Sequence, residues 1–459
     1  MFQLLKKTIV VIISFVISLT PLKPQPVQKC EPKFNGTFVQ PWLTVTWDDE
    51  RWQEEIAAMK EAGVEYLILQ ETADKSSQLS GDGSWTVYYP SDCQALNGSY
   101  EGEDCVEAAL RNCSGTGIKV FIGLAMFDDW WDLAAFGSQY KEVCNISAYM
   151  AEEMYNRYHS LYPDSFYGWY FVPEINNMPH VKLSINAVAD GLNTILDKIT
   201  QLDPNMPMLL SPYFTEYISV PSALATLPMW ITFFERAELR DGDIFCPQDA
   251  IGAKWVSEKN LEKIWRMYSE AVKSCEADIL LWANVENFIK PFADSDLAGI
   301  IKPQPTENTK MVPTTLDRLV WQMETASHYA ENIITFSYSH YYSPANVSNI
   351  YHNTYVDYIN NGFNLEAQVP SQPQEFKANK TEGGVDLSWN PSTDNFGISY
   401  YRLTRCGEFL ARIEVHGEDI LTAFTDTDIY GLSGEITYEV TAYDAAGNAS
   451  QSSSVSIVI

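Results

Sequence analysis

Short apolar runs alternate with amphipathic stretches along most of this chain, and this alternation constrains the fold more than any other feature. The apolar runs have the length of strands, and the stretches after them repeat apolar residues at helical spacing, as Trp52, Ile56 and Met59 do in DERWQEEIAAMKEAG. We predict strands at residues 36–42, 64–70, 118–124, 166–172, 207–213, 243–249, 278–288 and 333–339. We predict helices near residues 49–63, 103–113, 146–161, 183–203, 223–239, 258–275, 315–332 and 347–360.

Eight such units in succession predict an α/β protein with a (β/α)8 TIM barrel over residues 30–365. The alternative for this pattern is a doubly wound open sheet, which usually begins with a glycine-rich phosphate-binding turn. The sequence has no such turn after its first predicted strand. We therefore expect the barrel.

The pattern changes near Val369, where VPSQPQ reads as a linker over residues 366–373. Residues 374–459 alternate apolar and polar positions, with many turns and no helical period. Two stretches, VDLSWNPSTDNFGISYYRLTR and ITYEVTAYDAAGNASQSS, resemble a fibronectin type III module, with Trp389, Tyr401 and Tyr438 at its core aromatic positions. The resemblance implies an all-β sandwich of the kind that often accompanies secreted carbohydrate-active enzymes.

Residues 1–29 have the order of a secretory signal peptide: the basic pair Lys6 and Lys7, an apolar run from Ile9 to Leu19, and a proline-rich polar stretch. The apolar run is shorter than the about 20 residues that span a membrane. No small-x-small cleavage site follows it, so an uncleaved N-terminal anchor stays open as the alternative. We expect a secreted or extracellular protein, anchored to a membrane if this segment is retained.

The eight cysteines of an exported chain favour disulfides. Cys93, Cys105, Cys113 and Cys144 lie close together in the sequence, and two bridges among them would have three possible connectivities. Cys246, inside an apolar strand, and Cys406, in the last domain, are expected to be free.

The formal net charge of -30, from 30 basic and 60 acidic residues, would repel the phosphates of nucleic acid and an anionic membrane surface. We therefore expect no nucleic-acid partner. Neither C-x-x-C nor H-E-x-x-H occurs, and the six histidines are scattered, so the sequence supports no metal site and no cofactor. We expect a monomer.

A (β/α)8 barrel places its working groups at the carboxyl ends of its strands, and the acids at the predicted strand ends are Glu71, Asp128, Asp129, Glu174, Asp249 and Glu286. Two of these stand out because they follow directly on apolar strands rather than on polar loops. Glu174 ends the fourth predicted strand and Glu286 ends the seventh. Two facing carboxyl groups, one protonated in a drier pocket and one kept ionised, can cleave a glycosidic bond. A separation of about 5 to 5.5 Å would indicate retention of the anomeric configuration, and about 6.5 to 9.5 Å inversion. For one glutamate alone, a barrel-end residue held by a backbone amide or by a buried arginine is an equally good interpretation.

Aromatic and amide side chains near the strand ends suit sugar binding, because aromatics stack on pyranose rings and amides bind hydroxyl groups. The candidate substrate-binding residues are Gln40, Trp42, Gln70, Trp130, Trp131, Asn176, Tyr213, Gln248, Asp249, Trp282, Asn284 and Tyr338. Each aromatic alone could also fill the barrel core or a helix seam, and Trp130 and Trp131, in a loop beside Asp128 and Asp129, are the least expected to do so.

The order GTFVQPW, MKEAGVEYLILQ, GWYFVPEI, PQDAIG and WANVENF resembles the TIM-barrel family called domain of unknown function 4434, which is related to clan-A glycoside hydrolases. In that clan the acid/base glutamate ends strand four and the nucleophile ends strand seven, so the resemblance implies these roles for Glu174 and Glu286. The clan usually has asparagine directly before the strand-four glutamate, where this chain has Pro173. It often has a tyrosine near strand six, where this chain offers Gln248 and Asp249.

We therefore predict a secreted glycoside hydrolase that cleaves an oligosaccharide or polysaccharide by a two-carboxylate, retaining mechanism without metal. The C-terminal module is expected to contact polysaccharide or a cell surface. One alternative is a catalytically inactive barrel that binds carbohydrate. The other is a different hydrolase or lyase class centred on Glu174 and Asp249.

Overall fold

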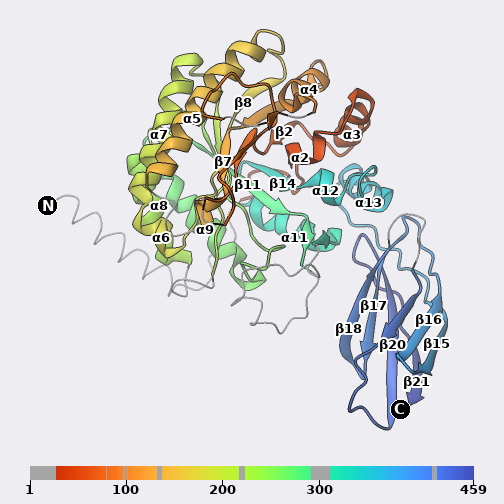
Figure 1. Ribbon diagram of the computed structural model, residues 1–459. Coiled ribbons are helices and arrows are strands. Elements are labelled where there is room, and N and C mark those ends of the chain that lie inside the picture. The colour runs from red at the N-terminus through yellow and green to blue at the C-terminus, as the bar shows by residue number, and fades with distance from the viewer. Residues whose placement is uncertain are drawn as a thin grey trace. The chain divides into compact units, whose positions relative to one another are not determined.

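The computed structural model describes residues 27–78, 80–96, 99–100, 102–131, 137–216, 223–290, 311–415 and 421–459. Eight parallel strands form a closed barrel in the order β1-β14-β11-β10-β9-β8-β6-β2 (Figure 1). These strands are β1 (Gly36–Val39), β2 (Tyr66–Leu69), β6 (Lys119–Gly123), β8 (Phe166–Phe171), β9 (Met208–Leu210), β10 (Ile244–Phe245), β11 (Leu280–Glu286) and β14 (Asn332–Phe336). The predicted TIM barrel is confirmed.

Amphipathic helices follow the strands and surround the barrel (Figure 1). They are α3 (Asp49–Glu61), α4 (Cys105–Cys113), α5 (Ser138–Met154), α7 (Ile185–Leu202), α8 (Leu227–Arg236), α9 (Leu261–Val272) and α11 (Leu316–Ser327). A further helix, α13 (Asn349–Asn360), follows later in the chain. Side chains cap several of them: Asp48 accepts a hydrogen bond from the Arg51 amide in α3, and Asp104 accepts from two amides of α4. Short helices α2 (Pro41–Thr44), α6 (Pro179–Leu183) and α12 (Tyr338–Tyr341) lie in the connections after β1, β8 and β14.

The inward-facing side chains of the strands form one buried apolar cluster. Its members are Phe38, Ile68, Phe121, Tyr170, Val172, Leu209, Ile244, Cys246, Trp282 and Ile334. Alternate residues of a strand point to the same face. The residue two positions after a member of this cluster therefore also faces the barrel axis. Those positions include Gln40, Gln70, Glu174, Gln248 and Asn284, where the inward face changes from apolar to polar.

A small additional sheet lies beyond the ends of the second and third barrel strands, and we call it the rim sheet. Its strands are β3 (Ala73–Lys75), β4 (Trp85–Val87), β5 (Ser99–Tyr100) and β7 (Ala125–Phe127), in the order β5-β4-β3-β7. In register, Asp74 of β3 lies between Thr86 of β4 and Met126 of β7.

The C-terminal region is an all-β sandwich of two antiparallel sheets (Figure 1). One sheet contains β15 (Gln374–Thr381), β16 (Gly384–Asn390) and β19 (Ala423–Asp426). The other contains β17 (Ile398–Arg405), β18 (Glu408–Glu414), β20 (Glu435–Asp444) and β21 (Ser453–Val458). Trp389, Tyr401 and Tyr438, which carried the resemblance to a fibronectin type III module, are all buried in its core.

The chain divides into two compact units, Met1–Glu286 with Gln322–Ser339 and Asn287–Trp321 with His340–Ile459. In the second unit, the backbone N–H groups of Leu316 and Asp317, at the start of α11, donate to the carbonyls of Ala445 and Ala446 in the sandwich. The predicted domain boundaries at residues 365 and 374 remain predictions.

All eight cysteines are free, so the bridges considered for Cys93, Cys105, Cys113 and Cys144 are not formed. Cys105 and Cys113 begin and end α4, and eight residues of helix span about 12 Å, which is too far for a disulfide between them. Most of the predicted signal peptide, residues 1–26, lies outside the described residues. Among the described helices, none is both long enough and apolar enough to span a membrane.

Candidate active site

Glu174 lies three residues beyond the end of β8, and its backbone is held from both sides. The indole N–H of Trp130 and the amide of Asn176 both donate to the Glu174 carbonyl oxygen, at 3.0 and 3.1 Å. Asn177 exchanges two hydrogen bonds with the backbone of Thr215, which connects the segments after β8 and β9. The asparagines after Glu174 therefore fix the course of the chain at the barrel mouth.

The Glu174 side chain is partly exposed, but it is surrounded closely enough that burial raises the pKa of its carboxyl to about 7. A hydrogen bond from Gln248 opposes this effect, because it stabilises the ionised carboxylate and lowers the pKa. Glu174 can therefore be protonated near neutral pH, as a general acid must be.

Glu286 is the last residue of β11 and is buried, with 4% of its surface exposed. Its Oε2 accepts a hydrogen bond of 2.7 Å from the Ala253 backbone N–H. Its own N–H lies 3.3 Å from Asp249 Oδ1, and its carbonyl accepts from Gln322. The amide contact favours the ionised form of the Glu286 carboxyl.

A polar layer connects these strand ends. Gln248 Nε2 donates to the Ser211 carbonyl at 3.2 Å, and Asn284 Nδ2 donates to Ser211 Oγ at 3.1 Å. The backbones of Gln248 and Asn284 also form an isolated parallel β-bridge, which joins the segment after β10 to β11. Gln248 thus links the seventh strand to Glu174, as a polar residue that lines a sugar site would.

Asp249 is fully buried and accepts hydrogen bonds from Gln322 at 2.5 Å and from the Ile251 N–H at 3.2 Å. These contacts give Asp249 the geometry of a residue that supports the Glu286 strand end.

The predicted substrate-binding aromatics lie in two kinds of place. Trp130, Trp282 and Tyr338 are buried, and the Trp282 ring packs 4.9 Å from that of Tyr66 inside the barrel. Trp42 is 51% exposed and Tyr213 is partly exposed, so these two can offer a ring face to a sugar. The side chain of Trp131 lies outside the described residues.

Glu71, one of the acids that the sequence places at strand ends, directly follows the candidate Gln70 at the end of the second barrel strand. Burial, and then the charges of Asp74 and Glu174, raise the pKa of Glu71 to about 8. Burial, and then the charges of Glu174 and Glu71, raise the pKa of the Tyr170 phenol, so both glutamates lie near this side chain. Glu71 is therefore a neighbour of Glu174 at the mouth. In the sequence, its position after an apolar strand indicated a place at the barrel mouth, but other acids have the same position relative to their strands.

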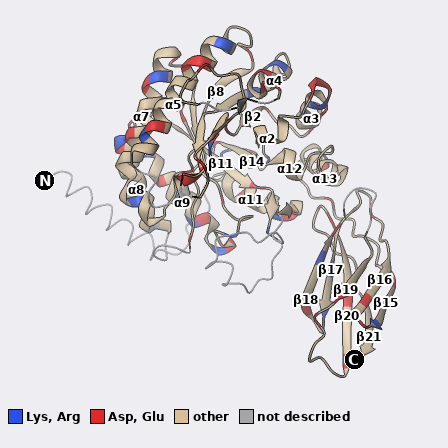
Figure 2. Cartoon of the chain, in the orientation of Figure 1, with Lys and Arg blue, Asp and Glu red and all other residues tan. Residues whose placement is uncertain are grey.

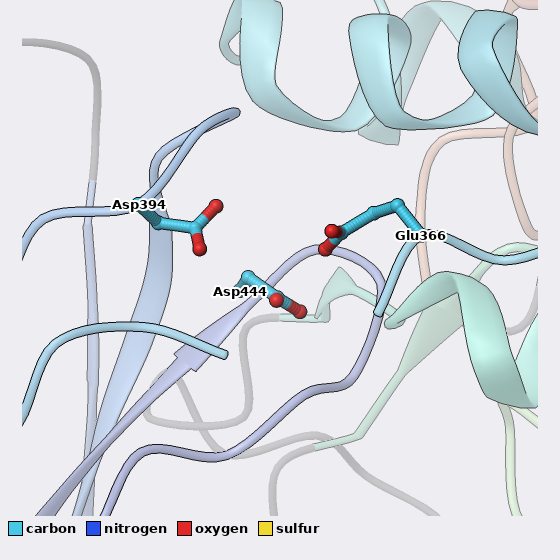
Figure 3. Close-up of side chains that lie close together, drawn as sticks. All are labelled: Glu366, Asp394 and Asp444. Atoms are coloured by element: carbon cyan, nitrogen blue, oxygen red, sulfur yellow. The ribbon is translucent and has the colours of Figure 1, made fainter. Parts of the chain in front are cut away.

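Outside the barrel mouth, Glu366, Asp394 and Asp444 come together in the second compact unit (Figure 3). Each offers a carboxylate oxygen, and these oxygens lie within 4.8 Å of one another. The sequence had suggested no metal site, because this group is assembled from three distant positions. Asn448 donates to both Glu366 and Asp444, which connects two of the three.

A closed eight-stranded parallel barrel with glutamates and amides at its carboxyl strand ends defines a TIM-barrel protein. Residues 34–348 match the family model described as "Domain of unknown function (DUF4434)". This match covers more than half of the chain, so the protein belongs to that family.

Two solved structures are similar to this chain at low sequence identity. A protein described as a putative alpha-L-fucosidase from Bacteroides thetaiotaomicron VPI-5482 superimposes with a TM-score of 0.56 at 19% identity, over 76% of this chain and 97% of that one. An endo-beta-1,4-mannanase from Thermotoga petrophila matches with a TM-score of 0.42 at 12% identity, over 93% of this chain and 97% of that one.

A local sequence match is to an alpha-amylase from Niallia circulans, at 38% identity over 88 residues. The match covers 18% of this chain and 6% of that relative.

Proposed function

We propose that this protein is a glycoside hydrolase, in which Glu174 is the general acid/base and Glu286 the second carboxylate. The observation that carries this proposal is the difference between the two environments. Burial favours the protonated form of Glu174, whereas the Ala253 amide favours the ionised form of Glu286. Pairs of carboxyl groups whose surroundings separate their protonation states commonly divide acid and nucleophile roles.

In the proposed reaction, the Glu174 carboxyl donates its proton to the glycosidic oxygen as the bond to the anomeric carbon breaks. The Glu286 carboxylate attacks that carbon and forms a glycosyl ester. Glu174, now ionised, removes a proton from water as the water displaces Glu286 from the sugar. Gln248 stabilises Glu174 in this ionised state, through the hydrogen bond that it donates.

Carbohydrate is the proposed substrate, with Gln40, Gln70, Asn284 and Gln248 offering amides and Trp42 and Tyr213 offering ring faces. The similar structure described as a putative alpha-L-fucosidase agrees with this class by its description. We also propose that the protein is exported and that its C-terminal sandwich, as a fibronectin type III-like module, contacts polysaccharide.

The test is hydrolysis of a polysaccharide panel by the wild type and by Glu174→Gln and Glu286→Gln, with product stereochemistry followed by NMR. Both variants should lose at least about 100-fold in kcat, because general acid–base and nucleophilic roles each contribute at least that much. Binding of the same polysaccharide should survive. Asp49→Asn, on the exposed start of α3, is the matched control and should keep full activity.

Three outcomes would contradict the assignment. Full activity in both glutamine variants would remove their catalytic roles. Binding without hydrolysis in the wild type would favour an inactive carbohydrate-binding barrel. An esterifying probe that labels Asp249 in place of Glu286 would favour the hydrolase or lyase class centred on Glu174 and Asp249.

A further inference from the structure

The barrel mouth carries more carboxyl groups than two-carboxylate hydrolysis uses. We call Glu71, Asp74 and Asp128 the rim carboxyls. Glu71 follows β2, Asp74 is the middle residue of β3, and Asp128 directly follows β7. Asp128 is exposed, and Glu71 and Asp74 are partly exposed. Each of the three therefore keeps some surface that a ligand can reach, while Oδ1 of Asp74 is buried.

The rim sheet presents Asp74 toward the barrel mouth. Its neighbours in β3, Ala73 and Lys75, are buried on the opposite face, as the alternation of a strand requires. Met126 lies in register with Asp74 on the adjacent strand, and so shares its face. Met126 packs against the apolar cluster of the barrel interior. Asp74 therefore lies on the same face of the rim sheet as Met126, the face that meets the barrel interior.

The rim carboxyls have acidic neighbours and no paired cation. The negative charges of Asp74 and Glu174 raise the pKa of Glu71, in addition to its burial. Burial, and then the charge of Asp128, raise the pKa of Asp74 to about 6. Within the described ranges, no ion pair joins a rim carboxyl or Glu174 to a basic side chain. The adjacent Lys75 pairs with Glu142. Ionised carboxylates so close to one another repel, and the binding of a cation or a proton relieves this repulsion.

The unpartnered hydrogen-bonding groups at these strand ends are acceptors, which also require a partner that donates. Gln70 Oε1, Asp74 Oδ1 and Asn284 Oδ1 are buried acceptors without a hydrogen-bond partner. Asn284, 1% exposed, is bridged to Gln248, which binds Glu174. A ligand that completes this site must donate hydrogen bonds.

The arrangement of the rim carboxyls distinguishes between a metal ion and an organic cation as the ligand. A metal ion gathers carboxylate oxygens around one point. In the described part of the chain, the group of three or more carboxylates with oxygens within 4.8 Å is Glu366, Asp394 and Asp444, and the rim carboxyls form no such group. Carboxyls that come from three different segments and do not gather around one point suit ammonium groups carried by successive units of a chain.

We propose that the rim carboxyls bind the ammonium groups of an amino sugar polymer, so that the substrate is a glycan with free amino groups, of the glucosamine type. This inference rests on the proposed glycoside hydrolase, since it identifies the substrate class of the same site. Each ammonium group supplies both the missing positive charge and up to three hydrogen-bond donors.

Binding of a glucosamine oligosaccharide and of its fully N-acetylated counterpart of equal length, measured by calorimetry with the full chain, tests the proposal. The wild type should bind the amino form about tenfold more tightly, with an affinity that falls as salt increases. Glu71→Gln with Asp74→Asn should bring the two affinities within about twofold. Both single variants and a thermal unfolding curve accompany the double variant, so that a folding defect is recognised.

The control is needed because a net charge of -30 attracts any polycation. Glu50→Gln with Glu54→Gln, at exposed positions of α3, removes the same charge and should keep the preference. Equal loss in both double variants, equal binding of the two oligosaccharides by the wild type, or an unchanged preference without Glu71 and Asp74 would each overturn the proposal. A preserved preference without hydrolysis would support it and would overturn the hydrolase alone.

Discussion

At the scale of single residues, Glu174 and Glu286 follow apolar strands of similar pattern, but their carboxyl groups have different neighbours. Glu174 meets an amide side chain, Gln248, across the barrel mouth, whereas Glu286 meets a backbone amide, that of Ala253. The side-chain contact can be removed by substitution, and the backbone contact cannot. This difference makes the protonation of Glu174 open to a direct test.

The wild-type kcat/KM should fall as the pH rises through about 7, because the general acid Glu174 then loses its proton. In Gln248→Ala, this alkaline limb should move to higher pH, since the ionised carboxylate loses a donor and its pKa rises. Profiles of kcat/KM against pH for both proteins check the shift, whatever the variant loses in absolute rate.

Glu174→Gln serves as the reference, because its residual activity should have no limb near pH 7. A limb that stays in place in Gln248→Ala, or that moves to lower pH, would show that Gln248 does not govern the acid.

At the scale of strands and helices, the barrel strands meet through close backbone contacts that only glycine allows. A Cβ atom at Gly123, in β6, would lie 1.9 Å from the Gln70 carbonyl oxygen of the chain leaving β2. Thr72 then donates to the Gly123 carbonyl at 2.8 Å. This approach positions Gln70 and Glu71 at the mouth, so the geometry of the site depends on one missing side chain.

Gly123→Ala should destabilise the protein by about 3 kcal/mol or more, because the obstructing atom is backbone that cannot rotate away. Gly137→Ala is the control: it has no heavy atom within 4 Å of its Cβ position, and as the N-cap of α5 it should lose no more than about 1 kcal/mol. Denaturant unfolding of the three proteins measures both effects. Equal stability of the two variants would show that β2 and β6 can separate without cost.

The elements themselves could be predicted from the sequence, because helical spacing and strand-length apolar runs are local patterns. The predicted positions of Glu174 and Glu286 at strand ends followed from the same patterns. The places of Trp130 and Trp282 could not be predicted, because burial depends on segments that are distant in the sequence. Trp282 packs on Tyr66, and Trp130 binds the carbonyl of Glu174. The approach of Glu71 to Glu174 depends on such long-range packing too.

At the scale of the whole molecule, acidic residues outnumber basic ones, and both occur along the outer helices of the barrel (Figure 2). A chain with this excess must place some carboxyls close together, and it does so in the second compact unit at Glu366, Asp394 and Asp444 (Figure 3). Glu366 belongs to the predicted linker, while Asp444 ends β20 of the sandwich. Their protonation therefore affects how the linker is attached to the sandwich.

Burial raises the pKa of Asp444 to about 7, with Asn448 opposing and Glu366 adding to the effect, from an ordinary value of 3.8. Because the folded pKa lies above the unfolded one, the folded state binds the proton more tightly. The contribution of Asp444 to stability is therefore full below about pH 4 and is lost as the pH rises to about 7. Asp444→Asn, which stays neutral, should lose less stability than the wild type over this interval. Unfolding free energies of both proteins from pH 4 to pH 8 measure the difference. A parallel dependence on pH in the two proteins would show that Asp444 is ionised throughout and that the three carboxyls do not share a proton.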